Sequence, residues 1–315
     1  MGLFYGKCTS TVRLDGKTAI VTGSNTGIGK ETAQDFFQRG CRVIMACRNL
    51  QKANDAVADI KSRCGEKADL GELVVAELDL SSLQSVRKCA KHLLDTERRI
   101  DLLINNAGVM MTPQGKTVDG FETQFGTNHL GPFLFTLLLL PKIIDSKPAR
   151  IVNVSSLAHE MGSMDFNDLM YEKKRYSALG AYQQSKLANV LFAKELARRL
   201  EAANIRGITT YSLHPGVIAT ELGRHLGNTY VGLATWVWNS FMPYFVKTPL
   251  QGAQTTIYCA VDERCADETG LYYSDCAVRS AAKAALDVDA GRRLWEESLK
   301  LVDLKPDYDP FGASQ

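Results

Sequence analysis

Short apolar runs rich in β-branched residues alternate with longer stretches of helical periodicity over the first 155 residues. The strand-like runs are Thr18–Val21, Arg42–Ala46, Leu73–Leu78, Leu102–Ile104 and Ile151–Val154. The helix-like stretches include Lys30–Gln38, Gln51–Lys61 and Leu83–Leu94. The strand-like runs are apolar throughout, which is typical of parallel strands buried on both faces. The pattern therefore predicts βαβ units, with helices on both faces of one sheet.

The alternation continues with a helix near Ala181–Leu200 and a strand near Gly207–Leu213. No repeat, low-complexity stretch or linker rich in Pro, Gly and Ser divides the chain. We therefore predict one α/β domain of the Rossmann type over residues 16–315, built on a single doubly wound parallel sheet. Residues 1–15 are an N-terminal extension in this prediction.

Two stretches interrupt the alternation, and each follows a predicted strand. Residues 157–179 follow the fifth strand, and residues 221–250 follow the sixth and form a predicted lid over the substrate. Ligands bind at the carboxyl ends of parallel strands, so both stretches are expected to wall a pocket. The apolar residues expected there are Met161, Met164, Phe166, Leu169 and Met170 in the first stretch, and Leu222, Leu226, Val231, Leu233, Trp236, Val237, Trp238, Phe241, Met242 and Phe245 in the second.

Charge and cysteine content narrow the classes of function. The 315 residues carry a net charge of +2 without a sustained basic patch, which argues against a nucleic-acid partner. The eight cysteines form no CxxC pair, so we expect free thiols in a reducing compartment and no metal site. The first 17 residues contain no apolar run long enough for a signal peptide or a membrane span. We therefore expect a cytoplasmic protein.

The first predicted strand runs into a glycine-rich turn that opens the first helix. The turn reads Thr-Gly-Ser-Asn-Thr-Gly-Ile-Gly from Thr22 to Gly29. Glycines let the backbone turn sharply and approach a pyrophosphate, and the free N–H groups of the helix N-terminus attract that anion. The candidate cofactor-binding residues here are Thr22, Gly23, Asn25, Thr26, Gly27, Ile28 and Gly29.

The end of the second predicted strand indicates which nicotinamide cofactor is used. NAD-dependent enzymes usually place a carboxylate there, where it holds the ribose 2′-hydroxyl. This chain instead has Arg48, about 20 residues past the glycine turn. A guanidinium suits a 2′-phosphate through paired, charge-assisted hydrogen bonds. We therefore predict NADP (NADPH), with a solvated arginine that opens the next helix as the alternative.

Three further strand ends add candidates for the cofactor pocket. Asp79 and Leu80 follow the third strand, where the Asp79 carboxylate can accept a hydrogen bond from the adenine amino group. Capping of the next helix is the alternative role for Asp79, although Ser81 and Ser82 can also cap that helix. Small residues after the fourth strand let the cofactor approach closely, and the candidates there are Asn105, Ala107 and Gly108. The turn after the sixth strand either binds the cofactor or only reverses the chain, and its candidates are Pro215, Gly216, Val217 and Thr220.

The candidate acid–base pair lies on the helix that follows the fifth strand. Tyr182 and Lys186 are one turn apart on the same face. A phenol titrates too high to act as a base at neutral pH, but a nearby ammonium favours the phenolate and lowers its pKa. The pair is therefore a candidate for general acid–base catalysis. Ser156 ends the fifth strand, where its hydroxyl can hydrogen-bond a substrate oxygen, and Ser155 is the alternative.

The order of the TGxxxGxG turn, the NNAG segment and the YxxxK pair resembles the short-chain dehydrogenase/reductase family over roughly residues 16–275. Within that family the chain is similar to retinol dehydrogenases of the microsomal type, through ACRN, LDLSS, LINNAGVMM, TNHLGPF, RIVNVSSLAH, YQQSKLANVLFAKEL and LHPGV. The resemblance implies that Ser156 is the catalytic serine and that Thr220 and the Pro-Gly backbone hold the nicotinamide carboxamide. It also implies that Asn128 holds a proton-relay water near Lys186, with a plain buried asparagine as the alternative.

Together these residues predict an NADP-dependent oxidoreductase that interconverts an apolar alcohol and its aldehyde or ketone. Hydride passes to or from nicotinamide C4, with Tyr182 as the acid or base. The resemblance implies a substrate like retinol or retinal. The same chemistry on a steroid, prenyl or xenobiotic carbonyl is the alternative, as is a catalytically weak NADP-binding scaffold.

Apolar surface predicts two partners besides the apolar small-molecule substrate. Residues 229–246 are apolar and aromatic, so we expect peripheral contact with a membrane, at the endoplasmic reticulum or on lipid droplets. The helix 181–200 carries apolar residues on more than one face, namely Leu187, Val190, Leu191, Leu196 and Leu200. Because only one face can pack on the sheet, we hypothesise a homodimer through this helix, with burial by residues 229–246 as the rival.

Overall fold

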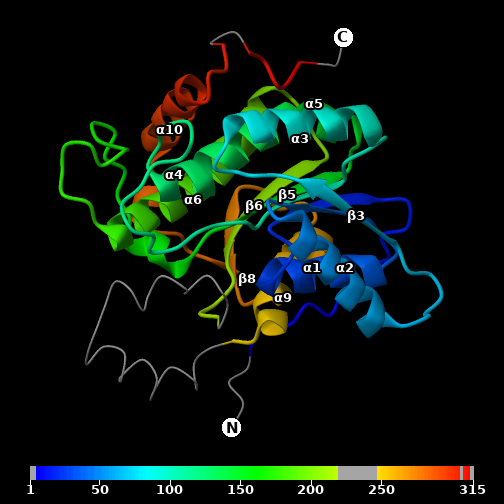
Figure 1. Ribbon diagram of the computed structural model, residues 1–315. Helices are drawn as coiled ribbons and strands as arrows, with labels where there is room; N and C mark the ends of the chain where they lie inside the picture. The colour runs from blue at the N-terminus through cyan, green and yellow to red at the C-terminus, as the bar shows by residue number, and fades with distance from the viewer. Residues whose placement is uncertain (1–4, 219–246, 306–307, 313–315) are drawn as a thin grey trace.

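Figure 1 shows the computed structural model of the chain, which describes residues 5–218, 247–305 and 308–312. One eight-stranded sheet has the strand order β3-β2-β1-β4-β5-β6-β7-β8. The strands are β1 (Thr18–Thr22), β2 (Arg42–Cys47), β3 (Glu72–Glu77), β4 (Leu102–Asn105), β5 (Ala149–Val154), β6 (Ile208–His214), β7 (Leu271–Ser274) and β8 (Ala277–Arg279). Neighbours pair in parallel, except that β7 and β8 are antiparallel. The order reverses between β1 and β4, and such a switch point opens a crevice for a ligand.

Helices cover both faces of the sheet (Figure 1). One face packs against α1 (Gly27–Gln38), α2 (Leu50–Cys64) and α9 (Pro249–Val261). The other packs against α3 (Leu83–Thr96), α5 (Gly131–Asp145), α6 (Ala178–Ala202) and α10 (Val288–Leu301). Side chains of β1 alternate between the two cores, since Ile20 belongs to one and its neighbours Ala19 and Val21 to the other. Burial on both sides explains why the strands are apolar without alternation.

Five short helical elements complete the described structure. They are α4 (Thr123–Phe125), the π-helix η1 (Gly126–Leu130) and the 3₁₀ turns η2 (Leu157–Met161), η5 (Glu263–Cys265) and η6 (Lys283–Leu286). α4, η1 and α5 follow one another without a break, as one helix over Thr123–Asp145. A π-helix inside a longer helix is frequently found at a functional site.

The predicted sheet of parallel strands with helices on both faces is confirmed, and each predicted strand or helix is present with ends shifted by a few residues. α5 was not predicted, because it is apolar nearly all round and shows no polar face. Its helix, Thr123–Asp145, is long and apolar enough to cross a membrane, but 78% of the apolar window is buried inside the protein. Burial of this kind is typical of a core helix.

The C-terminal helix α10 packs against the apolar side of α6. All five apolar residues behind the homodimer hypothesis are buried within the monomer, with at most 2% of their surface exposed. Trp295 of α10 packs against Phe192 of α6 with ring centroids 5.9 Å apart, and the Arg199 guanidinium lies 4.4 Å from the Trp295 ring. These five residues therefore need no second copy to cover them, and the homodimer stays a prediction without this support. Residues 229–246, the rival cover, lie outside the described residues.

The described part of the N-terminal extension packs on the rest of the protein. Cys8 and Leu14 are buried in the same core as α1 and α9. The Cys8 N–H donates to Gln254 Oε1 at 3.2 Å, which fixes the extension to α9. Residues 8–14 are therefore part of the packed structure, although they precede the predicted domain boundary.

Candidate active site

The glycine turn after β1 has the backbone that a bound anion requires. Gly23 and Gly27 have φ angles of +65° and +56°, which favour glycine, and α1 begins at Gly27. The Thr26 side chain makes no capping hydrogen bond, so it does not occupy the first N–H groups of the helix. A Cβ added at Gly29 would lie 2.5 Å from Asn106 Nδ2, so only glycine fits where the turn meets β4.

Hydrogen bonds between the ends of β1 and β4 hold this turn in place. Thr22 Oγ1 accepts from the N–H groups of Asn106 and Ala107, both at 3.0 Å. The Asn106 side chain donates to the Thr22 carbonyl at 2.9 Å. Sequence reasoning missed Asn106, although the doubled asparagine of NNAG was its signal. Thr22 and Asn106 thus hold the turn in position through these hydrogen bonds.

Asn105 lies within the sheet rather than at its edge. Its Nδ2 donates to Thr136 Oγ1 at 2.9 Å and to Asn153 Oδ1 at 3.0 Å, and the side chain is buried. The amide therefore links β4 to β5 and to α5. Gly108 lies nearer to the candidate catalytic groups, because a Cβ there would be 3.1 Å from Asn128 Oδ1 and 3.4 Å from Lys186 Nζ.

The two candidates for the adenosine end follow β2 and β3. Arg48 is exposed directly after β2, and no described residue forms a hydrogen bond or an ion pair with its guanidinium. Asp79 is half-buried, and its Oδ1 accepts from the Ser81 N–H at 2.9 Å. Ser82 is the residue that caps α3, since its side chain accepts from Ser85 N. Asp79 therefore does not cap α3. Leu80 beside it is buried against α5.

Tyr182 and Lys186 are both buried on α6, one turn apart. Lys186 Nζ lies 5.7 Å from the centre of the Tyr182 ring and donates to the Val154 carbonyl at 3.1 Å. Burial raises the pKa of Tyr182 to about 12, although its hydrogen bond with Ser156 acts in the opposite direction. Burial lowers the pKa of Lys186 to about 8. The phenol is therefore protonated at pH 7, and the expected lowering of its pKa by Lys186 is not among the causes that act on it.

The structure distinguishes between the two candidate serines. Ser155 is buried, and its Oγ donates to the Lys186 carbonyl at 2.6 Å, so that hydroxyl is occupied. Ser156 is partly exposed, and its hydroxyl lies close enough to Tyr182 to lower the pKa of the phenol. It also accepts from the Ala158 N–H at 3.2 Å at the start of η2. Only Ser156 has its hydroxyl beside the phenol, which supports it as the catalytic serine.

Asn128 lies in the π-helix η1 and is completely buried. Its Oδ1 accepts from the Val109 N–H at 2.8 Å, and its Nδ2 donates to the Val109 carbonyl at 2.9 Å and to Ser185 Oγ at 3.0 Å. Both side-chain donors are thus used to join the NNAG loop to α6. The side chain is a buried, hydrogen-bonded asparagine, and the proton-relay water stays a prediction.

The next residue, His129, points into the core on the other side of η1. It is fully buried, and its Nε2 lies 2.8 Å from Ser298 Oγ on α10. Its ring centroid is 5.1 Å from that of Phe125 and 5.8 Å from that of Phe133. Burial lowers the pKa of His129 to about 3, so the ring is neutral at pH 7. His129 therefore joins η1 to α10 and is not a candidate acid.

The Pro-Gly turn follows β6 at the same edge of the sheet. Gly216 has a φ of +101°, and a Cβ there would lie 2.5 Å from Lys247 Cδ. The Val217 carbonyl accepts from the Lys247 N–H at 2.8 Å, and Pro215 is buried. Thr220 and most of the predicted lid, residues 219–246, lie outside the described residues. Sequence reasoning missed Lys247, which no motif marks.

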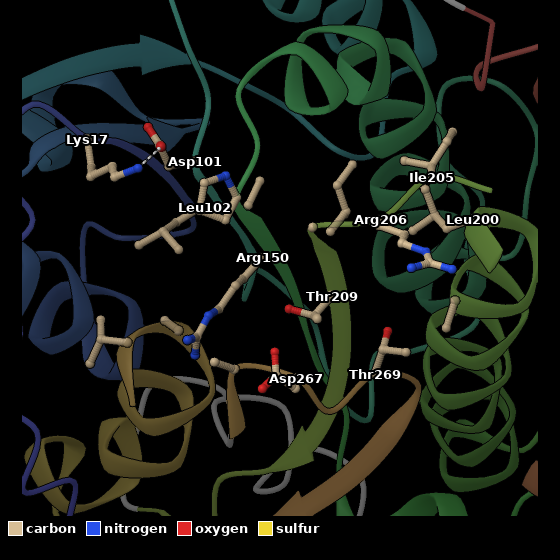
Figure 2. A pocket seen from close by; sticks show the side chains of 18 of the residues that line it. Lys17, Asp101, Leu102, Arg150, Leu200, Ile205, Arg206, Thr209, Asp267 and Thr269 are labelled. Atoms are coloured by element: carbon tan, nitrogen blue, oxygen red, sulfur yellow. Dashed lines mark ion pairs between the residues drawn. The ribbon is translucent and has the colours of Figure 1, made fainter. Parts of the chain in front are cut away.

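A cavity of about 790 Å³ lies at the opposite, amino-terminal edge of the sheet (Figure 2). One pair of charged groups on its wall is an ion pair, in which Lys17 Nζ lies 2.9 Å from Asp101 Oδ1. The Arg150 guanidinium donates to two main-chain carbonyls, of Cys259 at 3.0 Å and Asp262 at 2.9 Å. The cavity is therefore separate from the cluster at the carboxyl edge.

Comparisons with known proteins agree with this geometry. The sequence model of the short chain dehydrogenase family matches residues 17–230. The chain belongs to the short-chain dehydrogenase family. It is 48% identical over 306 residues to retinol dehydrogenase 11 of Mus musculus, covering 97% of this chain and 92% of that relative. It is 47% identical over 307 residues to retinol dehydrogenase 13 of Homo sapiens, covering 95% and 88% of the two chains.

Solved structures show the same fold. An uncharacterized protein from Mycobacterium paratuberculosis has a TM-score of 0.73 and 34% sequence identity, covering 95% of this chain and 98% of the other. The Pseudomonas aeruginosa RhlG/NADP complex has a TM-score of 0.63 and 25% identity, covering 82% and 94%. Family and fold together make this chain an oxidoreductase of alcohols and carbonyl compounds that uses a nicotinamide cofactor.

The residues at the carboxyl edge fit such a cofactor. The turn from Gly23 to Gly29 leaves room for a pyrophosphate over the start of α1, and Gly108 leaves room beside Lys186. Among the described residues, no group of three or more His, Cys, Asp or Glu side chains could hold a metal ion. All eight cysteines are free thiols, and seven of them are buried.

Replacing Tyr182 with Phe should lower kcat at least 100-fold, roughly the contribution of a positioned general acid. The affinity for the cofactor should change little, because only the hydroxyl that transfers the proton is removed. Stopped-flow reduction of a carbonyl substrate and a fluorescence titration of the cofactor measure the two effects. Lys186→Ala is the control and should weaken both. A Tyr182→Phe enzyme with a near-normal rate would require another acid.

The rate of carbonyl reduction should fall as the pH rises through about 8, where the buried Lys186 ammonium loses its proton. Lysine is charged below its pKa, so activity depends on the protonated form and is lost on the alkaline side. The pH profile of kcat/KM reports this group in the free enzyme. In Lys186→Arg, whose guanidinium does not titrate in this range, the residual activity should lose this limb. A wild-type profile that stays flat beyond pH 8 contradicts the role of a charged Lys186.

Proposed function

We propose that this protein is an NADP-dependent oxidoreductase that interconverts an apolar alcohol, retinol-like, and its aldehyde or ketone. The observation that carries the proposal is the grouping of Ser156 and the buried Tyr182 and Lys186, in which the Ser156 hydroxyl acts on the pKa of the Tyr182 phenol and Lys186 Nζ lies 5.7 Å from the centre of the Tyr182 ring. Relatives named retinol dehydrogenases, 48% and 47% identical, support the class of substrate.

In this proposal each residue of the cluster has one task. Ser156 hydrogen-bonds the carbonyl oxygen, and Tyr182 donates the proton that this oxygen needs when it becomes an alcohol. Lys186 holds the ribose of the cofactor and stabilises the negative charge left on the phenol oxygen. The bound nicotinamide supplies or accepts the hydride at C4. Because burial keeps Tyr182 protonated, the site is prepared to donate a proton, which favours reduction.

The preference for NADP rests on Arg48. Its guanidinium is exposed at the carboxyl end of β2, where a dinucleotide's adenosine ribose lies, and no described residue neutralises it. A 2′-phosphate would accept paired hydrogen bonds from it. The P. aeruginosa relative complexed with NADP shows that this fold accepts the phosphorylated cofactor in another member.

Arg48→Asp should weaken NADPH binding by about 10-fold or more, on the order of one charge-assisted hydrogen bond. The same change should improve tolerance of NADH, because a carboxylate can accept from a free ribose 2′-hydroxyl. Isothermal titration of both cofactors measures the two affinities. Lys67→Asp, in an exposed loop before β3, makes the same charge change at the opposite edge and should leave both affinities unchanged. Equal affinity of the wild type for both cofactors would refute the preference.

The apolar substrate is supported by the surface next to Ser156. Leu157 and Met161 in η2 are 50% and 77% exposed, and Val217 after the Pro-Gly turn is 40% exposed. The other apolar residues of the predicted wall are turned inward: Leu169 is buried, and Met164, Phe166 and Met170 pack against the core. Fewer residues of 157–179 therefore face a substrate than the sequence predicted. Contact of residues 229–246 with a membrane stays a prediction, since they lie outside the described residues.

The value of kcat/KM for aldehydes should rise with apolar chain length, because each added methylene that is buried contributes about 0.8 kcal/mol, or about 4-fold. A series of straight-chain aldehydes and retinal, measured with NADPH, tests this. Leu157→Ser and Met161→Ser should flatten the rise without changing the rate for the shortest aldehyde. A flat wild-type series, or a preference for short polar carbonyls, would exclude an apolar substrate.

A further inference from the structure

The peptide group that follows the catalytic serine is bound at both of its polar ends by histidine side chains. Its carbonyl oxygen belongs to Ser156 and lies 2.7 Å from His159 Nδ1. Its N–H belongs to Leu157 and donates to His214 Nδ1 at 3.1 Å. His159 comes from η2, and His214 is the last residue of β6. A single peptide unit is thus held between two imidazole rings from separate parts of the chain, an arrangement we call the histidine clamp.

The hydrogen-bond partners determine the tautomer of each ring. His159 Nε2 faces the N–H of Ala282 at 3.2 Å and must accept from it. The proton of the neutral ring is therefore on Nδ1, which donates it to the Ser156 carbonyl. His214 has the opposite tautomer, because its Nδ1 accepts from Leu157 and its proton must be on Nε2. A doubly protonated imidazole has no acceptor nitrogen, so each ring fits its place only when neutral.

The surroundings of His159 favour the neutral ring. The ring is buried, and its centroid lies 4.6 Å from that of Tyr272 on β7. Burial lowers the pKa of His159, opposed in part by the hydrogen bond to Ser156 and by the charge of the neighbouring Glu160. The net direction is downward, so His159 is neutral at pH 7.

His214 is neutral for a similar reason. Burial lowers its pKa to about 4, and the charge of Lys247 acts in the same direction. Asp275 opposes them, but it is paired with Lys247, whose Nζ lies 2.5 Å from Asp275 Oδ1. The second ring, His159, also lowers the pKa of His214, since two nearby imidazoles resist a shared positive charge. His214 therefore keeps its acceptor nitrogen at every pH well above 4, and His159 keeps its own at pH 7.

We propose that His159 and His214 are positioning residues for Ser156, which direct its hydroxyl toward Tyr182 by holding the Ser156–Leu157 peptide at both polar ends. The inference rests on the proposed function, in which Ser156 binds the substrate oxygen. Rotation of this peptide would break both hydrogen bonds together. It would also displace the next N–H, of Ala158, which donates to Ser156 Oγ at 3.2 Å. The direction of the hydroxyl thus depends on the two rings, although neither touches the substrate.

The tautomers can be measured without any turnover. In ¹⁵N-histidine NMR of the whole protein at pH 7, His159 should have its proton on Nδ1 and His214 on Nε2, with the signals assigned by the single variants. The His214 signal should keep its tautomer down to about pH 5, and the His159 signal should titrate below the ordinary pKa of histidine. The same tautomer on both rings, or protonation near the ordinary pKa of histidine, overturns the clamp. If the clamp is found and no carbonyl substrate is turned over, the proposed function fails, while the tautomers still support the clamp as a feature of Ser156.

Paired substitutions separate positioning from folding. An asparagine amide lies where Nδ1 lies, whereas a glutamine amide reaches only the position of Nε2. His159→Asn and His214→Asn should therefore keep the bond to the peptide and retain kcat within about 3-fold, while His159→Gln and His214→Gln should lose 10-fold or more, on the order of a misplaced reactive group. The KM and the affinity for NADPH should change less than about 3-fold in all four, since binding surfaces are intact.

The exposed His92 on α3 offers a matched control, and His92→Gln should leave kcat unchanged. Melting temperatures of all variants show whether a loss of rate follows a loss of folding. Equal kcat values in the Asn and Gln variants at each position overturn the proposal. So does a fall in kcat that follows the melting temperature rather than the choice of amide.

Discussion

The burial of the Lys186 ammonium is the constraint on which the site depends. A charged amine inside a protein needs a close polar partner, and the described structure offers it the carbonyl of Val154, at the end of β5. The main chain of the same lysine is fixed as well, because its carbonyl accepts from Ser155 Oγ. One residue of α6 is thus attached to the end of β5 twice. Tyr182, one turn earlier, takes its place beside Ser156 from this double attachment.

The same burial gives the acid and the lysine different protonation preferences. Removal from water raises the pKa of the phenol and lowers that of the ammonium, since the neutral form of each is favoured. Tyr182 is therefore protonated at pH 7. In the proposed mechanism the Lys186 ammonium, 5.7 Å from the centre of the Tyr182 ring, must stabilise the phenolate that remains when Tyr182 donates this proton.

Local signals in the sequence predicted the sheet and the positions of the main site residues. The apolar strands, the glycine turn and the one-turn spacing of Tyr182 and Lys186 each depend on a few neighbouring residues. What escaped prediction depends on contacts between distant segments. Asn106 supports the turn by bonding Thr22, 84 residues away, and α10 covers α6 from the far end of the chain.

The choice between alternatives also needed the three-dimensional structure. Ser155 and Ser156 are adjacent, but the Lys186 carbonyl engages the buried Ser155 hydroxyl and the partly exposed Ser156 acts on Tyr182. Asn128 and Asp79 were each ambiguous between a functional and a structural role, and only their partners show how each side chain is used. The sequence pattern of α6 led to the hypothesis that a second copy of the chain covers its apolar faces. Such a pattern shows that a face is apolar but does not show what packs against it.

The contact between His129 and Ser298 has a consequence for how the enzyme is made. The two residues are 169 positions apart, and the contact joins the π-helix that carries Asn128 to α10. A ribosome delivers Asn128, Ser156, Tyr182 and Lys186 well before it delivers α10. Until α10 has been synthesised, the apolar side of α6 and the side of the π-helix that carries His129 are exposed to water and to other chains. The nascent protein therefore carries the candidate catalytic residues on an unfinished core, and the synthesis of α10 protects that core from aggregation.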